Sequence, residues 1–144
     1  MTVNSDFIKE KLAYSKKYIE RLRRIIEISE EKFLDDFSLQ LQSERIFEVI
    51  SQIMLDICTH IIAHSSETPP SSYTDCVKRL VDVGVINEEE ASYFINIIKM
   101  RNLLVHQYGI INLEILFTSL KMLDSDFEKF KELILSWIEK QTHF

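Results

Sequence analysis

Four polar residues close to the end of one apolar segment have side chains suited to acid–base and phosphate chemistry. The stretch MRNLLVHQYG, residues 100–109, holds Arg101, Asn102, His106 and Tyr108. Histidine exchanges protons near neutral pH, and a guanidinium binds phosphate through paired hydrogen bonds. An arginine and a histidine five positions apart therefore raise the hypothesis of a site that acts on a phosphate.

Helical geometry separates the two strongest candidates. At 100° per residue, Arg101 and Tyr108 lie within about 20° of each other, whereas Arg101 and His106 point about 140° apart. Asn102 and His106 are four residues apart and share a different face. A single straight helix therefore cannot direct Arg101 and His106 at one phosphate. Either the helix ends or bends between them, which Gly109 favours, or a second copy of the chain completes the site.

Ordinary structural roles account for the same residues on spacing alone. Arg101 can pair with an acid on a neighbouring helix. His106 can bond the last carbonyls of its helix and interact favourably with the helix dipole. Tyr108 can be an amphipathic interface residue, and Asn102 a solvent-facing polar one. Both interpretations stay open at this point.

Other motifs for catalysis or metal binding are missing. The sequence has no glycine-rich phosphate loop, GxSxG, HExxH or paired-cysteine zinc spacing. Asp56, His60 and His64 are spaced by four, but each step rotates by about 40°, which spreads the outer two too far for one coordination sphere. We expect no metal site and no cofactor. Cys58 and Cys76 lack a CxxC spacing and are interpreted as reduced core thiols.

Composition predicts a globular, all-α protein. Of the 144 residues, 46% are hydrophobic and 28% are charged, and only two glycines and two prolines interrupt the chain. No β-alternation or internal repeat appears. The N-terminus has no apolar signal region and no apolar run approaches membrane-spanning length, so we expect a soluble, cytoplasmic protein with no membrane partner.

Apolar residues recur at helical spacing along the chain, and capping signals set the expected boundaries. A first helix is predicted from Asn4 or Ser5 to about Phe33, and a second follows turn chemistry at Asp35, Asp36 and Ser38 and continues to about Ile61. The remaining helices are predicted from about Ser72 to Val83 with Gly84 as terminator, from the Asn87–Glu90 capping box to near Gly109, and from Asn112 onward. The pattern predicts an up-and-down bundle of four long helices plus one short helix, with residues 1–144 as a single domain.

Charge is unevenly distributed. The net charge of −6 argues against a protein that coats nucleic acid non-specifically, yet residues 1–24 carry seven Lys/Arg against three Asp/Glu. Lys17, Arg21 and Arg24 fall on one side of a helix. The simpler interpretation is a solvated face, and the alternative is a weak phosphate-attracting stripe.

The stretch RNLLVHQY resembles the R-x4-6-H motif of the HEPN superfamily in its Arg-Asn-x3-His-x-Tyr form. It is similar to the HepT-like toxins that are encoded beside a minimal nucleotidyltransferase antitoxin. The resemblance covers most of the chain, including the acid-capped helix before the motif and the Asn-Leu-Glu restart after it. It implies a homodimer whose motif residues from both chains line one cleft. It also implies a metal-independent endoribonuclease that leaves a 2′,3′-cyclic phosphate.

The resemblance assigns a role to each motif residue. It implies that His106 is the general acid or base, that Arg101 steadies the phosphate and that Asn102 supports the cleft. Tyr108 corresponds to the tyrosine to which the antitoxin attaches AMP, and the added phosphate would oppose an anionic RNA substrate. We therefore predict a homodimeric endoribonuclease toxin that acts on RNA and not DNA, with a cognate minimal nucleotidyltransferase antitoxin. The alternatives are a non-catalytic HEPN module that binds a nucleotide or docks a nucleotidyltransferase, and a purely structural helical dimer.

Overall fold

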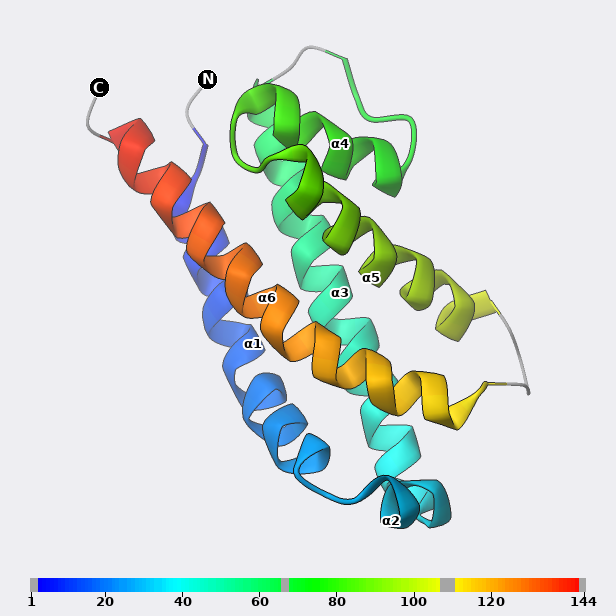
Figure 1. Ribbon diagram of the computed structural model, residues 1–144. Coiled ribbons are helices and arrows are strands. Elements are labelled where there is room, and N and C mark those ends of the chain that lie inside the picture. Colours follow the sequence, from blue (N-terminus) through cyan, green and yellow to red (C-terminus); the bar gives the residue numbers. More distant parts are fainter. Residues whose placement is uncertain (1–2, 66–67, 107–110, 143–144) are drawn as a thin grey trace.

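Helices account for nearly all of the computed structural model, which describes residues 3–65, 68–106 and 111–142 (Figure 1). They are α1 (Ser5–Ile26), α2 (Glu30–Asp35), α3 (Phe37–Ser65), α4 (Tyr73–Val83), α5 (Glu88–His106) and α6 (Leu113–Thr142). These ranges contain no strand. The predicted all-α bundle is confirmed: α1, α3, α5 and α6 are its four long helices, and α4 is the predicted short one.

A second short helix, α2, occupies the region where the first helix was predicted to continue. The helix α1 ends at Ile26, and Ser29 starts α2 because its side-chain oxygen accepts a hydrogen bond from the Lys32 N–H at 3.3 Å. Phe33 is nevertheless fully buried, with its ring centroid 4.8 Å from that of Phe117 on α6. The break thus redirects the chain at the base of the bundle and keeps the apolar residue of the pattern in the core.

The helix α3 runs through the centre of the bundle and contacts α1, α4, α5 and α6 (Figure 1). By length and composition it is apolar enough to cross a membrane, which the sequence pattern had not indicated. However, 67% of its most apolar window is buried inside the bundle. Its apolar surface is therefore used for helix packing on several sides.

Local caps fix the helices that lead to the motif. Ser72 caps α4, and Gly84 ends it in the left-handed conformation with φ of 90°. The predicted capping box opens α5: the Asn87 N–H donates to Glu90 Oε1 at 2.9 Å, and the Glu90 N–H donates to Asn87 Oδ1 at 2.8 Å. The Asn112 side chain accepts from the first turn of α6. The roles of Gly84, Asn87 with Glu90, and Asn112 agree with the sequence prediction, and Ser72 caps the helix that was predicted to begin near it.

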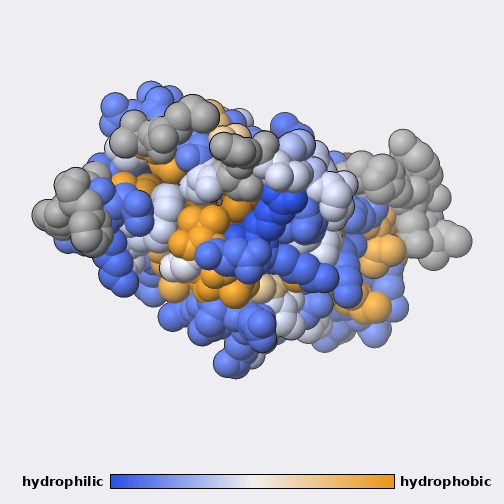
Figure 2. Space-filling model, turned by 90° about the horizontal axis from the view of Figure 1, so that it is seen from above, coloured by the Kyte–Doolittle hydropathy of each residue, from blue (hydrophilic) through white to orange (hydrophobic). Residues whose placement is uncertain are grey.

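Most of the surface at the end that carries the termini is hydrophilic, with apolar side chains in a small central patch and at a few places near the edges of the view (Figure 2). Elsewhere, Leu103 on α5 and Ile115 and Met122 on α6 are about half exposed. Ile115 and Met122 are seven residues apart and so share one face of α6. Apolar side chains therefore remain uncovered beside the end of α5 that carries the motif.

The capping box makes a prediction about stability. Asn87→Ala removes the side-chain acceptor of the Glu90 N–H and is expected to lower the free energy of unfolding by about 1 kcal/mol, whereas Asn87→Ser keeps an acceptor and should lose much less. Urea denaturation of the two variants and the wild type measures the difference. Equal losses for alanine and serine would show that the cap does not stabilise α5.

Candidate active site

The motif lies at the carboxyl end of α5, and the described residues include only part of it. The side chains of Arg101 and Asn102 are described, and the backbone of His106 is the last of α5. The side chain of His106 and all of Tyr108 lie outside the described residues. The divergence of Arg101 and His106 therefore stays a prediction.

Arg101 reaches from α5 onto the central helix α3. Its Nη2 donates to Gln52 Oε1 at 2.7 Å, and Gln52 Nε2 donates to Asp56 Oδ1 at 2.8 Å. Lys11 of α1 donates from Nζ to Asp56 Oδ2 at 3.1 Å. We call this chain of four side chains the Arg101 relay. It orients the Gln52 amide, because its oxygen must face the donor-only guanidinium and its NH₂ must face the carboxylate.

The partner of Arg101 is a neutral amide and not the acid that the structural interpretation of the sequence expected. Gln52 is the only hydrogen-bond partner of Arg101 among the described residues, and Nε of Arg101 is buried without one. A buried charged donor that lacks an acceptor is costly, so such groups commonly mark a place where a ligand supplies the acceptor. The arrangement leaves a positive charge available to an anion.

Tyr73, the first residue of α4, contacts the guanidinium from another side. Its ring centroid lies 5.5 Å from Arg101 Cζ, within the range of a cation–π interaction. Its side chain is 45% exposed, so the ring forms part of the surface beside Arg101. Arg101 is thus held by a hydrogen bond to α3 and by an aromatic ring of α4.

Asn102 is exposed and faces a neighbouring hollow of about 410 Å³. Tyr73 also lines this cavity, together with Thr59, Ile98 and the residues 70–72 and 74. Arg101 and Asn102 therefore face different neighbours but share Tyr73 as a common border. The structure brings these two motif residues to one region, at the junction of α3, α4 and α5.

The loop before α4 is fastened to the helix that follows it. Arg79 donates to the carbonyl of Thr68 and, at 3.2 Å, to that of Pro69, and it pairs with Asp75. The Ser71 N–H donates to Asp75 Oδ2 at 2.9 Å, and this hydrogen bond, followed by the charge of Arg79, lowers the pKa of the Asp75 carboxyl. These bonds hold the start of α4, and with it Tyr73, in place.

Asp56, His60 and His64 use their side chains for other contacts. Asp56 belongs to the Arg101 relay, and His60 Nε2 accepts from the Asn4 N–H at 3.1 Å. Desolvation, and then the charge of His64, lowers the pKa of His60, which favours the neutral ring that this acceptor role requires. His64 Nδ1 lies 2.8 Å from the His60 carbonyl oxygen. No group of three metal-ligating side chains forms within the part of the chain that the structure describes.

Sequence reasoning missed Gln52 and Tyr73. The four-residue spacing of Gln52 and Asp56 was a signal for a side-chain pair on one helix face. Nothing in the sequence connected that pair to Arg101, because the contact spans 49 residues and depends on how α5 packs on α3. Tyr73 gave no signal beyond its place next to a cap.

Comparisons with known proteins agree on one family. The model of the Ribonuclease HepT-like family matches residues 15–134. The chain is 30% identical over 104 residues to the tRNA nuclease HepT of Aphanizomenon flos-aquae, which covers 70% of this chain and 69% of that protein. It is 26% identical over 130 residues to the mRNA nuclease HepT of Shewanella oneidensis, with coverage of 90% and 97%.

A solved structure agrees with these relatives. The structure is similar to the tri-AMPylated Shewanella oneidensis HEPN toxin in complex with MNT antitoxin, with a TM-score of 0.82 at 26% identity. The similarity covers 91% of this chain and 98% of that one.

The relay predicts an energetic coupling between Arg101 and Gln52. In a double-mutant cycle with Arg101→Ala and Gln52→Ala, we expect a coupling of about 1 kcal/mol in the free energy of unfolding, because the bond is partly buried and charge-assisted. Urea denaturation of the four proteins measures it. Arg21 and Gln42 form a control pair with a similar but exposed bond of 2.8 Å, whose effects should be additive. Additivity at both pairs would contradict the relay.

Proposed function

Because the chain belongs to the Ribonuclease HepT-like family, we propose that it is an endoribonuclease toxin that cleaves RNA without a metal ion. The observation that carries the proposal is the state of Arg101. Its guanidinium is fixed by a neutral amide and an aromatic ring, and it keeps a buried donor without an acceptor, in the position that the R-x4-H motif gives to the phosphate-binding residue. The similarity to two HepT nucleases supports the same activity.

The reaction follows from the chemistry of the two motif residues. A base removes the proton of a ribose 2′-hydroxyl, the 2′-oxygen bonds to the adjacent phosphorus, and the bond from phosphorus to the 5′-oxygen breaks. An acid then protonates the leaving 5′-oxygen, so that the products are a 2′,3′-cyclic phosphate and a 5′-hydroxyl. His106 is the proposed base or acid, because the unperturbed imidazole of histidine exchanges protons near neutral pH. Arg101 stabilises the charge that develops on the phosphate.

A homodimer supplies the second proton-transfer group. With two copies facing one cleft, His106 of one protomer removes the proton and His106 of the partner subunit delivers the other. Leu103, Ile115 and Met122 support an interface near the motif, because these apolar side chains stay half exposed in a single chain. We also propose that Asn102, which borders the cavity next to Arg101, supports the cleft.

The proposed nucleophile restricts the substrate to RNA, since DNA has no 2′-hydroxyl. We propose a cytoplasmic protein in which residues 1–144 form one domain, with no membrane partner. A minimal nucleotidyltransferase is the proposed antitoxin, supported by the similar toxin whose structure contains an MNT antitoxin. It would attach AMP to Tyr108, and the added phosphate and bulk would oppose an anionic substrate at the cleft.

His106→Ala is expected to reduce RNA cleavage by at least about 10²-fold, because proton transfer of this kind contributes about 10²–10⁴-fold. The assay follows a labelled RNA in EDTA and scores products that end in a 2′,3′-cyclic phosphate. His64→Ala is the matched control and should cleave at the wild-type rate, and circular dichroism and the dimer mass should be unchanged in both variants. If wild-type protein binds RNA or nucleotide but leaves RNA intact, the non-catalytic HEPN module is the correct alternative.

Tyr108→Phe separates activity from its control. With ATP and the minimal nucleotidyltransferase, the wild-type tyrosine oxygen should displace pyrophosphate and gain AMP, whereas Tyr108→Phe should cleave RNA and gain none. Intact mass and residual cleavage after the reaction measure both properties. Tyr93→Phe, which removes the hydroxyl of a half-exposed tyrosine on α5, should be modified and silenced like the wild type. Modification of Tyr108→Phe at the wild-type level would refute the assignment.

A further inference from the structure

A groove between α1 and α3 collects positive charge. Lys17 and Arg21 of α1 and Arg45 of α3 line it, with no carboxylate among its described lining residues. Its volume is about 520 Å³, and the other residues that line it are Tyr18, Leu41, Gln42 and Ile46. None of the three cations takes part in an ion pair within the described ranges. In a chain of net charge −6, this concentration needs an explanation.

Two tyrosines stand beside these cations. Lys17 Nζ lies 5.2 Å from the ring centroid of Tyr14 and 5.5 Å from that of Tyr18, and the two hydroxyls are 3.2 Å apart. The hydrogen bond with Tyr18 lowers the pKa of Tyr14, and the charges of Lys17, Arg45 and Lys11 lower it further. Tyr14 therefore lies in the field of cations from both helices. Its ring is 49% exposed and is open to stacking.

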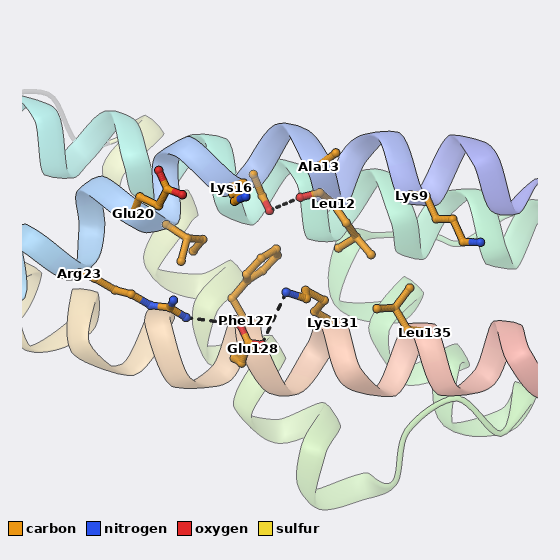
Figure 3. A pocket seen from close by; sticks show the side chains of 12 residues that line it. Lys9, Leu12, Ala13, Lys16, Glu20, Arg23, Phe127, Glu128, Lys131 and Leu135 are labelled. Atoms are coloured by element: carbon orange, nitrogen blue, oxygen red, sulfur yellow. Dashed lines mark hydrogen bonds and ion pairs between the residues drawn. The ribbon is translucent and has the colours of Figure 1, made fainter.

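A second groove, between α1 and α6, is also lined by basic residues but has carboxylates among them. There Arg23 and Lys131 both pair with Glu128 (Figure 3). Arg23 also bonds to Asp124. Glu20 lines the same groove, whose volume is about 490 Å³. Arg23 and Lys131 of this groove are thus paired with carboxylates, whereas Lys9 and Lys16 have no ion pair within the described ranges. The groove on α1 and α3 differs in that all three of its cations are unpaired and no carboxylate lines it within the described residues.

The cationic groove lies on the same helix faces as the Arg101 relay. Arg45 and Gln52 are seven residues apart on α3, so they lie within about 20° of each other and about 10 Å apart along the axis. Lys11 and Tyr18 have the same relation on α1. Because Lys11 and Gln52 belong to the relay, one surface leads from Arg101 to Arg45 and Lys17.

Glu48 interrupts the positive charge along this surface. It follows Arg45 by three residues and precedes Gln52 by four, so it lies on the same side of α3 between them. A nucleic-acid strand along this path would therefore be held at two points, the cationic groove and Arg101. In such a complex the cationic groove binds phosphates of the strand that do not react, and Arg101 binds the phosphate that does.

We propose that the groove formed by Lys17, Arg21 and Arg45, with Tyr14 and Tyr18, binds single-stranded RNA away from the bond that is cleaved. The cations contact backbone phosphates, and an unpaired base stacks on the exposed tyrosine. The inference rests on the proposed function, since it places the substrate of that reaction. It explains how an acidic protein obtains affinity for RNA, through one local surface instead of its overall charge.

The test compares two double variants of equal charge. Lys17→Glu/Arg45→Glu changes the cationic groove, and Lys9→Glu/Lys16→Glu changes the groove on α1 and α6. With His106→Ala in every protein to prevent cleavage, fluorescence anisotropy measures affinity for a labelled single-stranded RNA across a salt series. We expect the first variant to lose at least about tenfold in affinity and about 1.4 in the salt slope, as for two lost phosphate contacts. The second variant should change less than twofold.

A cleavage assay on the same double variants, now with the wild-type His106, separates this proposal from the proposed function. The groove variant should cleave a long RNA at least about tenfold less efficiently and cleave a dinucleotide as the wild type does. If the wild-type protein binds RNA through the groove but never cleaves it, the proposed endoribonuclease function is wrong and the proposed RNA-binding groove is supported. Equal affinity and equal cleavage in both double variants would contradict RNA binding by the groove. The same holds if the groove variant loses binding to the nucleotidyltransferase but still binds RNA as the wild type does. Lys17→Gln/Arg45→Gln gives the same comparison if the glutamate variant does not fold.

Discussion

The central helix α3 has to be apolar on most of its sides, because α1, α4, α5 and α6 all pack on it. This constraint decides the chemistry of the few polar residues that it carries. Gln52 and Asp56 lie within a run of buried residues and are themselves partly buried, so each needs hydrogen-bond partners in the protein for the polar atoms that water does not reach. They find them in each other, in Lys11 of α1 and in Arg101 of α5. The guanidinium of Arg101 is thus fixed because the polar side chains of α3 need hydrogen-bond partners.

Local physics made most of the fold predictable from the sequence. Helical spacing and caps such as Gly84, Asn87 and Asn112 depend on residues within a few positions of one another, and the structure has them where the sequence placed them. The break after Ile26 was missed because Phe33 fits the apolar pattern of α1 while lying on α2. A pattern of burial does not reveal a change of helix axis when the residue stays in the core.

The site was less predictable, because its contacts join distant segments. The sequence singled out Arg101 and Asn102 but not Gln52 or Tyr73, which come from α3 and α4. Likewise, the stripe of Lys17, Arg21 and Arg24 was visible on α1, but its completion by Arg45 required the packing of α1 on α3. Whether a basic residue is neutralised is also a tertiary property: Arg23 is paired with acids of α6, whereas Arg21 bonds only to the neutral Gln42 among the described residues.

The neutral partner of Arg101 is well matched to a group that has to bind a phosphate. A carboxylate at hydrogen-bond distance would fix the guanidinium, but it would also attract it with about 4 kcal/mol at an effective dielectric constant of 20, and a phosphate would have to compete with that attraction. The Gln52 amide fixes the same group and leaves its charge intact. The carboxylate of Asp56 sits one residue further along the relay, where the ammonium of Lys11 offsets its charge. The relay therefore supplies orientation without neutralisation, and a glutamate in place of Gln52 would supply both.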